Sequence, residues 1–205
     1  MLNWIFIIFF ASIDHSVLFS LLAGKLKGTC MGLIARIISS FSFAHERGLP
    51  IGSLTSQHFA NFYLNPFDRF ITEELKSGCH ARYMDDVVWW CRSKREARRS
   101  LQLARDFLRI NLGLLCNERM VQVGRSCRGI TFCGFRVFPG SVRLTRRKMR
   151  RYGQLRRANE ASYKRGEIGS LELQFAYEPL SATVRQADSL GWRQQEHIRH
   201  GVTEA

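Results

Sequence analysis

The sequence is short of acidic residues. Its 205 residues include 17 Asp and Glu against 31 Lys and Arg, so the formal net charge is +14. This imbalance predicts a polyanionic partner, with nucleic acid ranked before an acidic membrane. A solvated basic face on a soluble protein is the alternative. Because 45% of the residues are hydrophobic, the chain can form a core, which excludes wholesale disorder.

Paired cysteines are absent as well. The six cysteines include no Cys-x-x-Cys pair and no zinc-ligand spacing, which argues against a structural zinc site. Scattered single cysteines in apolar surroundings are typical of reduced core residues, so we expect a cytoplasmic protein. The sequence also lacks internal repeats and low-complexity linkers.

The N-terminus lacks the length of a membrane span. Residues 1–13 are almost wholly apolar, but about 18 apolar residues are needed to cross a bilayer, and no basic stretch precedes them. A buried strand is therefore favoured over a signal peptide or an anchor, and no membrane partner is expected. A membrane-anchored basic protein ranks last among the functional hypotheses.

Apolar periodicity and turn residues predict an α+β fold. The expected strands are 5–12, a hairpin of 79–83 with 87–91, and a second hairpin of 130–138 with 141–144. The expected helices are 16–26, 31–39, a helix from a Thr55 or Ser56 cap to Lys76, and 94–112, with a loop over 44–54. Between residues 143 and 165, ten Lys and Arg accompany one acid. A basic helical subdomain is therefore expected from residue 143.

Two adjacent carboxylates, Asp85 and Asp86, occupy the turn of the first predicted hairpin. Adjacent negative charges repel each other, and Mg²⁺ would relieve the repulsion because it prefers carboxylate oxygens and keeps positions open for phosphates. A pair of such ions can activate a primer 3′-hydroxyl and stabilise a pyrophosphate leaving group. A solvated acidic turn is the alternative.

Four strings occur in the order and spacing of one enzyme family. They are GLPIGSLTSQHFANFYLN (48–65), YMDD (83–86), NLGLLCNERM (111–120) and GITFCGFRVF (129–138). Together they resemble the motifs of reverse transcriptases, and the resemblance runs from residue 9 to about residue 192. It implies a palm over residues 1–142, an antiparallel sheet backed by helices, and a basic helical thumb over residues 143–205.

The resemblance implies RNA-directed DNA synthesis, in which dNTPs extend a DNA or RNA primer on an RNA template. Asp85 and Asp86 would be the catalytic residues and would hold Mg²⁺, with Mn²⁺ as the alternative metal. The thumb would bind the phosphates of an RNA–DNA duplex without sequence preference, through Arg146, Arg147, Arg150 and Arg151. A solvated helix face is the alternative for these arginines.

The resemblance also assigns roles to five further residues. Phe10 would block a ribose 2′-hydroxyl and Gln57 would lie in the nucleotide pocket, although a core position and a helix cap are the respective alternatives. Arg119 stands where the family often has a lysine, and we expect it to act by electrostatics alone, because its pKa is too high for proton donation. Gly134 and Phe135 would grip the primer end.

Ile51 indicates a subgroup. Many reverse transcriptases have glutamine at this position, whereas the string IGSLTSQ resembles the enzymes of diversity-generating retroelements, which make frequent errors at template adenines. An aliphatic side chain offers the nascent base pair no hydrogen bond, which would weaken discrimination. This resemblance implies a small basic accessory protein as a partner. Retron and group II intron enzymes are the next candidates, and packing under a loop is the alternative for Ile51.

The resemblance stops upstream of Phe9. The metal-binding aspartate of the family's first palm motif corresponds to Ile5, and no acid precedes Asp14. Asp14 is too far along the chain to replace that ligand. The fingers are missing, so we expect an N-terminal truncation through a frameshift, a mis-chosen start or a fragmentary gene. The second functional hypothesis is therefore a catalytically inactive remnant that binds nucleic acid.

Overall fold

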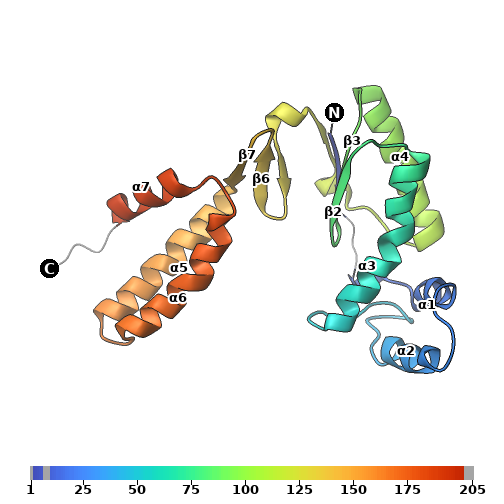
Figure 1. Ribbon diagram of the computed structural model, residues 1–205, viewed down its shortest axis with the longest axis horizontal. Coiled ribbons are helices and arrows are strands. Elements are labelled where there is room, and N and C mark those ends of the chain that lie inside the picture. The colour runs from blue at the N-terminus through green and yellow to red at the C-terminus, as the bar shows by residue number, and fades with distance from the viewer. Residues whose placement is uncertain (1, 7–9, 201–205) are drawn as a thin grey trace. The chain divides into compact units, whose positions relative to one another are not determined.

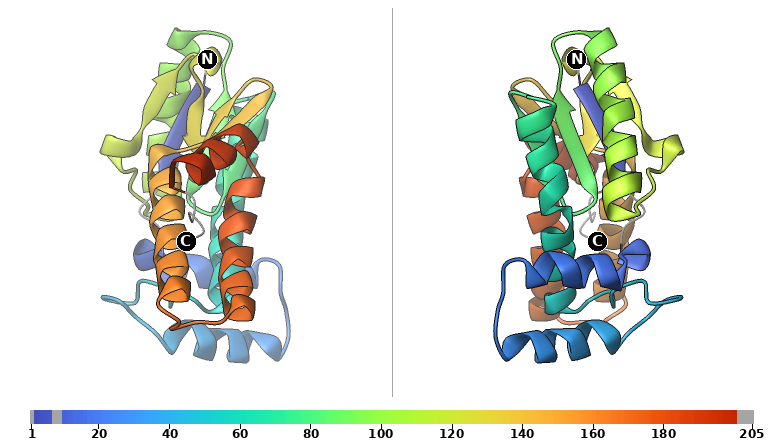
Figure 2. Two further views of the ribbon diagram at one scale, coloured as in Figure 1. Left: turned by 90° about the vertical axis from the view of Figure 1, so that its left-hand side faces the viewer. Right: turned by 90° about the vertical axis from the view of Figure 1, so that its right-hand side faces the viewer.

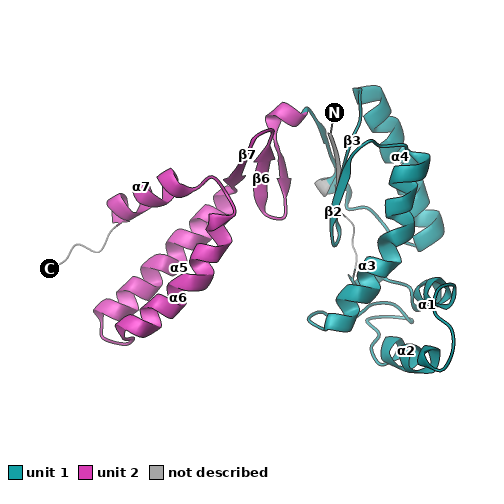
Figure 3. Ribbon diagram, in the orientation of Figure 1, with its two compact units in different colours: residues 1–125 teal, residues 126–205 magenta. Residues whose placement is uncertain are grey.

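The computed structural model describes residues 2–6 and 10–200 and divides the chain into two compact units (Figure 3). Unit 1 comprises residues 1–125 and unit 2 comprises residues 126–205. The division precedes the subdomain boundary expected at residue 143. Composition marks where the basic segment begins, whereas the chain's contacts group the strands between residues 130 and 144 with that segment.

Unit 1 contains a four-stranded sheet with the strand order β2-β3-β1-β4. Its strands are β1 (Leu2–Phe6), β2 (His80–Tyr83), β3 (Asp86–Trp90) and β4 (Gln122–Gly124), and β1 and β2 both pair antiparallel with β3. Its helices are α1 (His15–Ala23), α2 (Cys30–Ser39), α3 (Leu54–Arg69) and α4 (Lys94–Leu112), as Figures 1 and 2 show. Short helical turns occur at η1 (Phe10–Ser12), η2 (Phe70–Glu74) and η3 (Glu118–Met120).

Strand β3 is the buried centre of unit 1. Val87, Val88 and Trp89 are each at most 1% exposed. Because side chains alternate along a strand, Val87 and Trp89 share one face, and both belong to the core that α3 and α4 complete. The Trp89 indole Nε1 donates a hydrogen bond of 3.0 Å to Ser100 Oγ on α4, which satisfies its one polar atom.

The fully buried Tyr63 joins three elements of unit 1. Its hydroxyl donates to the Leu112 carbonyl at 2.6 Å, in the last turn of α4, and lies 3.4 Å from the Asp14 backbone nitrogen before α1. Helix α4 ends there because Gly113 adopts a left-handed φ of 60°. Burial raises the pKa of Tyr63 to about 12, so the hydroxyl keeps its proton.

Unit 2 contains a three-stranded antiparallel sheet and three helices. The strands are β5 (Ile130–Phe132), β6 (Phe135–Phe138) and β7 (Ser141–Leu144), preceded by the short turn η4 (Ser126–Arg128). The helices are α5 (Arg146–Lys164), α6 (Ser170–Arg185) and α7 (Leu190–His200), and α5 and α6 lie side by side (Figures 1 and 2). Tyr152, Leu180 and Val184 form the small core between them.

The mixture of helices and small antiparallel sheets confirms the α+β expectation, and four local predictions need correction. Strand β1 covers 2–6 rather than 5–12, since 10–12 form a helical turn and 7–9 lie outside the described residues. Ser53, rather than Thr55 or Ser56, occupies the N-cap position of α3, without a capping hydrogen bond from its side chain, and α3 ends at Arg69 before the π-turn η2. The segment 130–138 is two strands, because Cys133 and Gly134 turn the chain with φ of 49° and 75°. Cys30, Cys79 and Cys127 are exposed rather than core, although none of the six cysteines, all of which lie among the described residues, forms a disulfide.

No helix within the described part of the chain is both long enough and apolar enough to cross a bilayer.

Replacing Tyr63 with phenylalanine should destabilise the protein by about 1–2 kcal/mol, because the Leu112 carbonyl loses its buried donor. Urea unfolding followed by tryptophan fluorescence measures the change. Tyr83→Phe is the matched control, since Tyr83 is 65% exposed and should lose almost nothing. Equal free energies of unfolding for the Tyr63→Phe variant and the unaltered chain would refute this role.

Candidate active site and nucleic-acid surface

Asp85 and Asp86 lie at the tip of the β2–β3 hairpin. Tyr83 pairs with Asp86 across the ladder, so Met84 and Asp85 form a two-residue turn. Met84 adopts a left-handed φ of 54°, which is uncommon for a residue other than glycine. The apolar run after Asp86 anchors β3 in the core, so the two carboxylates sit where a buried strand reaches its end.

The environment of Asp85 disfavours its negative charge. The carboxyl is partly buried, and desolvation raises its pKa. A bound cation would oppose this effect, because an adjacent positive charge stabilises the carboxylate form. The oxygen donors of Asp85 and Asp86 therefore suit a hard cation such as Mg²⁺ in kind.

The number of donors falls short of a two-ion site. Strand β1 runs beside β3 with Ile5 opposite Val87 and Phe6 opposite Asp86, so Ile5 lies within one residue of the hairpin tip in register. An aliphatic residue supplies no metal ligand. Over residues 2–6 and 10–200, no three His, Cys, Asp or Glu side chains gather closely enough to hold an ion. Asp85 and Asp86 are suitable ligands for one hard cation, but the two residues do not supply enough ligands for two.

Asp14 and Asp68 are both engaged in other contacts and do not supply a further metal ligand. Asp14 caps α1 by accepting from the Ser16 and Val17 backbone nitrogens, and it pairs with Arg47 at 3.3 Å. The hydrogen bond from the Ser16 hydroxyl is the main reason why its pKa is lowered. Asp68, on α3, directs both carboxylate oxygens to Arg82. The expectation that Asp14 does not serve as the third metal ligand agrees with its capping role.

The expected nucleotide-pocket residues belong to two segments held together by backbone hydrogen bonds. The Leu49 nitrogen donates to the Phe10 carbonyl at 2.9 Å, and the Gly48 nitrogen to the Ile13 carbonyl at 2.8 Å. Phe10 is partly buried, and its ring packs against the core. These bonds place the 48–52 loop beside the η1 turn.

Ile51 and Gln57 are both exposed at the junction of this loop with α3. Ile51 is 88% exposed, which rules out packing under a loop. Gln57 lies in the first turn of α3 and is not its cap, since Ser53 holds that position. Gln57 precedes Asn61 by one helical turn, and Asn61 contacts the hairpin, so Gln57 shares the helix side that faces β2. Arg119 lies apart from this set in sequence, exposed on η3.

Gly134 and Phe135 form the turn and the start of strand β6 in unit 2. The Gly134 carbonyl accepts from Thr145 Oγ1 at 3.1 Å. Lys148 on α5 lies over both residues: its Nζ is 3.4 Å from the centre of the Phe135 ring, and a Cβ at Gly134 would meet its Cε at 2.8 Å. Burial lowers the pKa of Lys148. Glycine suits position 134 because of its φ of 75°, whereas the flexible end of Lys148 could move aside for a Cβ.

Helix α5 separates its basic residues into two groups. Four arginines are exposed and share one side of the helix, at the spacing i, i+1, i+4 and i+5: Arg146, Arg147, Arg150 and Arg151. Tyr152, Arg156 and Glu160 face inward. The exposed arginines can meet phosphates, whereas Arg156 cannot, so the count of ten basic residues overstates the charge available to a ligand.

Arg156 is fully buried and fastens α7 to α5. Its Nη1 lies 3.2 Å from Glu160 and 2.9 Å from His197 Nδ1, and its Nη2 donates to the carbonyls of Glu196 and His200. Glu160 also accepts from the Tyr177 hydroxyl on α6. The guanidinium therefore caps the carboxyl end of α7 from inside the unit.

The sequence analysis missed Arg82, Lys148 and Arg156. Arg82 could have been recognised, because a charged residue directly before YMDD in a predicted strand must find a partner or remain exposed. Lys148 and Arg156 lie in a segment where nearly every second residue is basic, and no pattern there distinguishes an interior basic residue from a surface one.

Comparison with known proteins agrees with this geometry. The sequence model of the family "Reverse transcriptase (RNA-dependent DNA polymerase)" matches residues 8–137, which is more than half of the chain and leaves Ile5 outside the match. No match was found among curated proteins. With a YMDD turn on an antiparallel hairpin, and a family match that spans it, the chain belongs to the reverse transcriptase family.

Proposed function

We propose that this chain acts in RNA-directed DNA synthesis, with Asp85 and Asp86 as its metal ligands. The observation that carries the proposal is the placement of both carboxylates at the tip of the β2–β3 hairpin, next to β1. In the reaction, the primer 3′-oxygen bonds to the α-phosphorus of a dNTP, and pyrophosphate leaves with the electron pair of the broken P–O bond. Bound Mg²⁺, or Mn²⁺ in its place, would neutralise charge on these phosphates.

The protein's own groups would orient the substrates. We assign Phe10 to exclusion of the ribose 2′-hydroxyl, Ile51 and Gln57 to the nascent base pair, and Arg119 to electrostatic stabilisation of pyrophosphate. Residues 1–142 would act as the palm and residues 143–205 as the thumb. Gly134 and Phe135 would hold the primer end, with their geometry fixed by Lys148.

A second candidate function is nucleic-acid binding without catalysis. Ile5 at the register position beside the hairpin tip favours it, because the cations would lack a ligand from β1. The basic face of α5 does not depend on that ligand. We therefore expect this chain to bind a primer–template duplex even if it extends the primer slowly.

Ile51 is the basis for a more specific proposal about the subgroup of reverse transcriptases. We propose a cytoplasmic enzyme of the diversity-generating retroelement type, with an RNA template, a DNA or RNA primer and a small basic accessory protein as partners. The high exposure of Ile51 supports this proposal, since the side chain is free to meet a base pair.

Synthesis by the unaltered chain should be weak, and Ile5→Asp should raise it by about a hundredfold, because a third carboxylate balances the metal charge. Extension of a labelled primer on an RNA template with Mg²⁺ measures the rate. Ile5→Asn is the control of similar size without the charge. Adding Asp85→Asn to the Ile5→Asp variant should abolish the gain, and vigorous synthesis by the unaltered chain would contradict the proposal.

Charge reversal on α5 should weaken binding to an RNA–DNA hybrid strongly and flatten its dependence on salt, because fewer phosphate counterions are released. The variant carries Glu at Arg146, Arg147, Arg150 and Arg151. Its control carries the same four reversals on and before α4, at the exposed Arg92, Arg95, Arg98 and Arg99. Fluorescence anisotropy at several salt concentrations measures both. The assignment of α5 is wrong if the two variants lose affinity equally.

Ile51→Gln should lower misincorporation opposite template adenines by about tenfold, because an amide can hydrogen-bond where an aliphatic group cannot. The comparison uses the Ile5→Asp background and sequencing of the products. Ile51→Leu keeps an aliphatic side chain and should keep the error spectrum. Identical error rates opposite adenine for all three enzymes would refute the assignment of Ile51 to the nascent base pair.

A further inference from the structure

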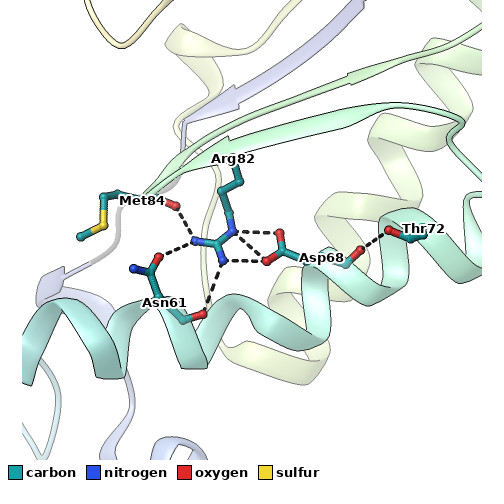
Figure 4. Close-up of polar contacts among 5 residues, drawn as sticks. All are labelled: Asn61, Asp68, Thr72, Arg82 and Met84. Carbon is teal, nitrogen blue, oxygen red and sulfur yellow. Dashed lines mark hydrogen bonds and ion pairs between the residues drawn. The ribbon is translucent and has the colours of Figure 1, made fainter.

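Arg82 connects the hairpin tip to helix α3 through one guanidinium (Figure 4). Its Nε and Nη2 bind the Asp68 carboxylate, with distances of 2.8 and 3.0 Å from Nε and 2.6 Å from Nη2. Its Nη1 donates to Asn61 Oδ1 at 2.8 Å and to the Met84 carbonyl at 3.3 Å. Its Nη2 also lies 3.5 Å from the Asn61 carbonyl.

This arrangement uses every N–H of the side chain. A guanidinium has one N–H on Nε and two on each Nη, and each of them has an acceptor here. The pair is well shielded, with the Arg82 and Asp68 side chains 13% and 23% exposed. A lysine would keep the charge but could not make the planar, two-pronged contact with Asp68 while also reaching Asn61 and Met84.

The contact with Met84 reaches the turn itself. Met84 directly precedes Asp85 and holds a left-handed φ of 54°, a conformation that costs free energy for a side chain with a Cβ. Such a conformation persists only where its surroundings fix it. Arg82 supplies one of the fixing contacts by holding the carbonyl of that residue, and α3 in turn holds Arg82.

We infer that Arg82 is a positioning residue for the metal site, acting through the Met84 carbonyl on the orientation of Asp85 and Asp86. Asp68 and Asn61 orient the guanidinium, and the Thr72 hydroxyl donates to the Asp68 backbone carbonyl at 2.9 Å. The inference rests on the proposed function, since it takes Asp85 and Asp86 to bind a divalent cation.

The test is Mn²⁺ binding to the purified chain, followed by electron paramagnetic resonance, with no need for polymerase activity. Arg82→Lys should weaken Mn²⁺ binding by about tenfold, as loss of a group that orients metal ligands commonly does. The substitution keeps the net charge, so long-range attraction of the cation is unchanged. Arg69→Lys is the matched control. Arg69 lies on α3 next to Asp68 and forms an exposed ion pair with Glu73, so this substitution should leave Mn²⁺ affinity unchanged.

Asn61→Ala provides a second variant if Arg82→Lys does not fold. It leaves the ion pair with Asp68 intact and removes only an acceptor of Nη1, so a smaller weakening is expected. Thermal unfolding of each variant separates the roles: a purely structural residue would lower Tm and leave Mn²⁺ affinity unchanged below the transition.

The outcomes separate the inference from the proposal beneath it. Loss of Mn²⁺ binding in Asp85→Asn, with weakening in Arg82→Lys and Asn61→Ala but not in Arg69→Lys, supports both. Binding that depends on Asp85 but is unchanged by Arg82→Lys and Asn61→Ala overturns the positioning role alone. Mn²⁺ binding that is indifferent to Asp85→Asn overturns the metal role of the hairpin, and the inference with it.

Discussion

Burial of strand β3 is the constraint on which the candidate active site depends. Val87, Val88 and Trp89 are all buried, and Val87 and Trp89 belong to the core that α3 and α4 complete, so β3 cannot shift along its axis without exposing them. The two carboxylates are thereby fixed where the apolar run ends. A one-residue slip would turn each side chain of β3 to the opposite face. Hydrophobic packing of β3 thus determines where Asp85 and Asp86 lie, although the packed residues supply no polar group to the site.

Local hydrogen bonds then fix the position of the hairpin tip more closely than hydrophobic packing alone. The Arg82 guanidinium binds α3 on one side and the turn on the other, and the Tyr63 hydroxyl joins α3 to the end of α4. Both residues form contacts that involve α3, the helix whose first turn carries Gln57. Helix α3 is therefore the common support for the hairpin tip and for the loop that carries Ile51. Unit 2 has its own support in the contacts of Lys148 with the β5–β6 turn.

The sequence predicted those parts whose pattern is strong and local. Helix α4 was predicted with its observed ends from its regular apolar face, and the Ser93 cap and left-handed Gly113 that the structure shows agree with those ends. The YMDD hairpin was predicted because apolar strands flank a polar turn. Apolar periodicity alone did not predict the turn at Cys133 and Gly134, since these two residues lie within an apolar run. It also could not show that Arg156 is interior while Arg157 beside it is exposed, because that difference depends on where α7 packs.

The contacts of Arg156 also impose an order on biosynthesis. Its acceptors include the carbonyl of His200, which is 44 residues later in the chain. A nascent chain that has emerged only as far as α6 can bring α5 and α6 together, but several N–H groups of this guanidinium then still need water. Burial of Arg156 must wait until α7 leaves the ribosome, because an unpaired buried charge is costly. The interior of unit 2 therefore closes only after α7 has emerged, whereas unit 1 has emerged by then and can already be folded.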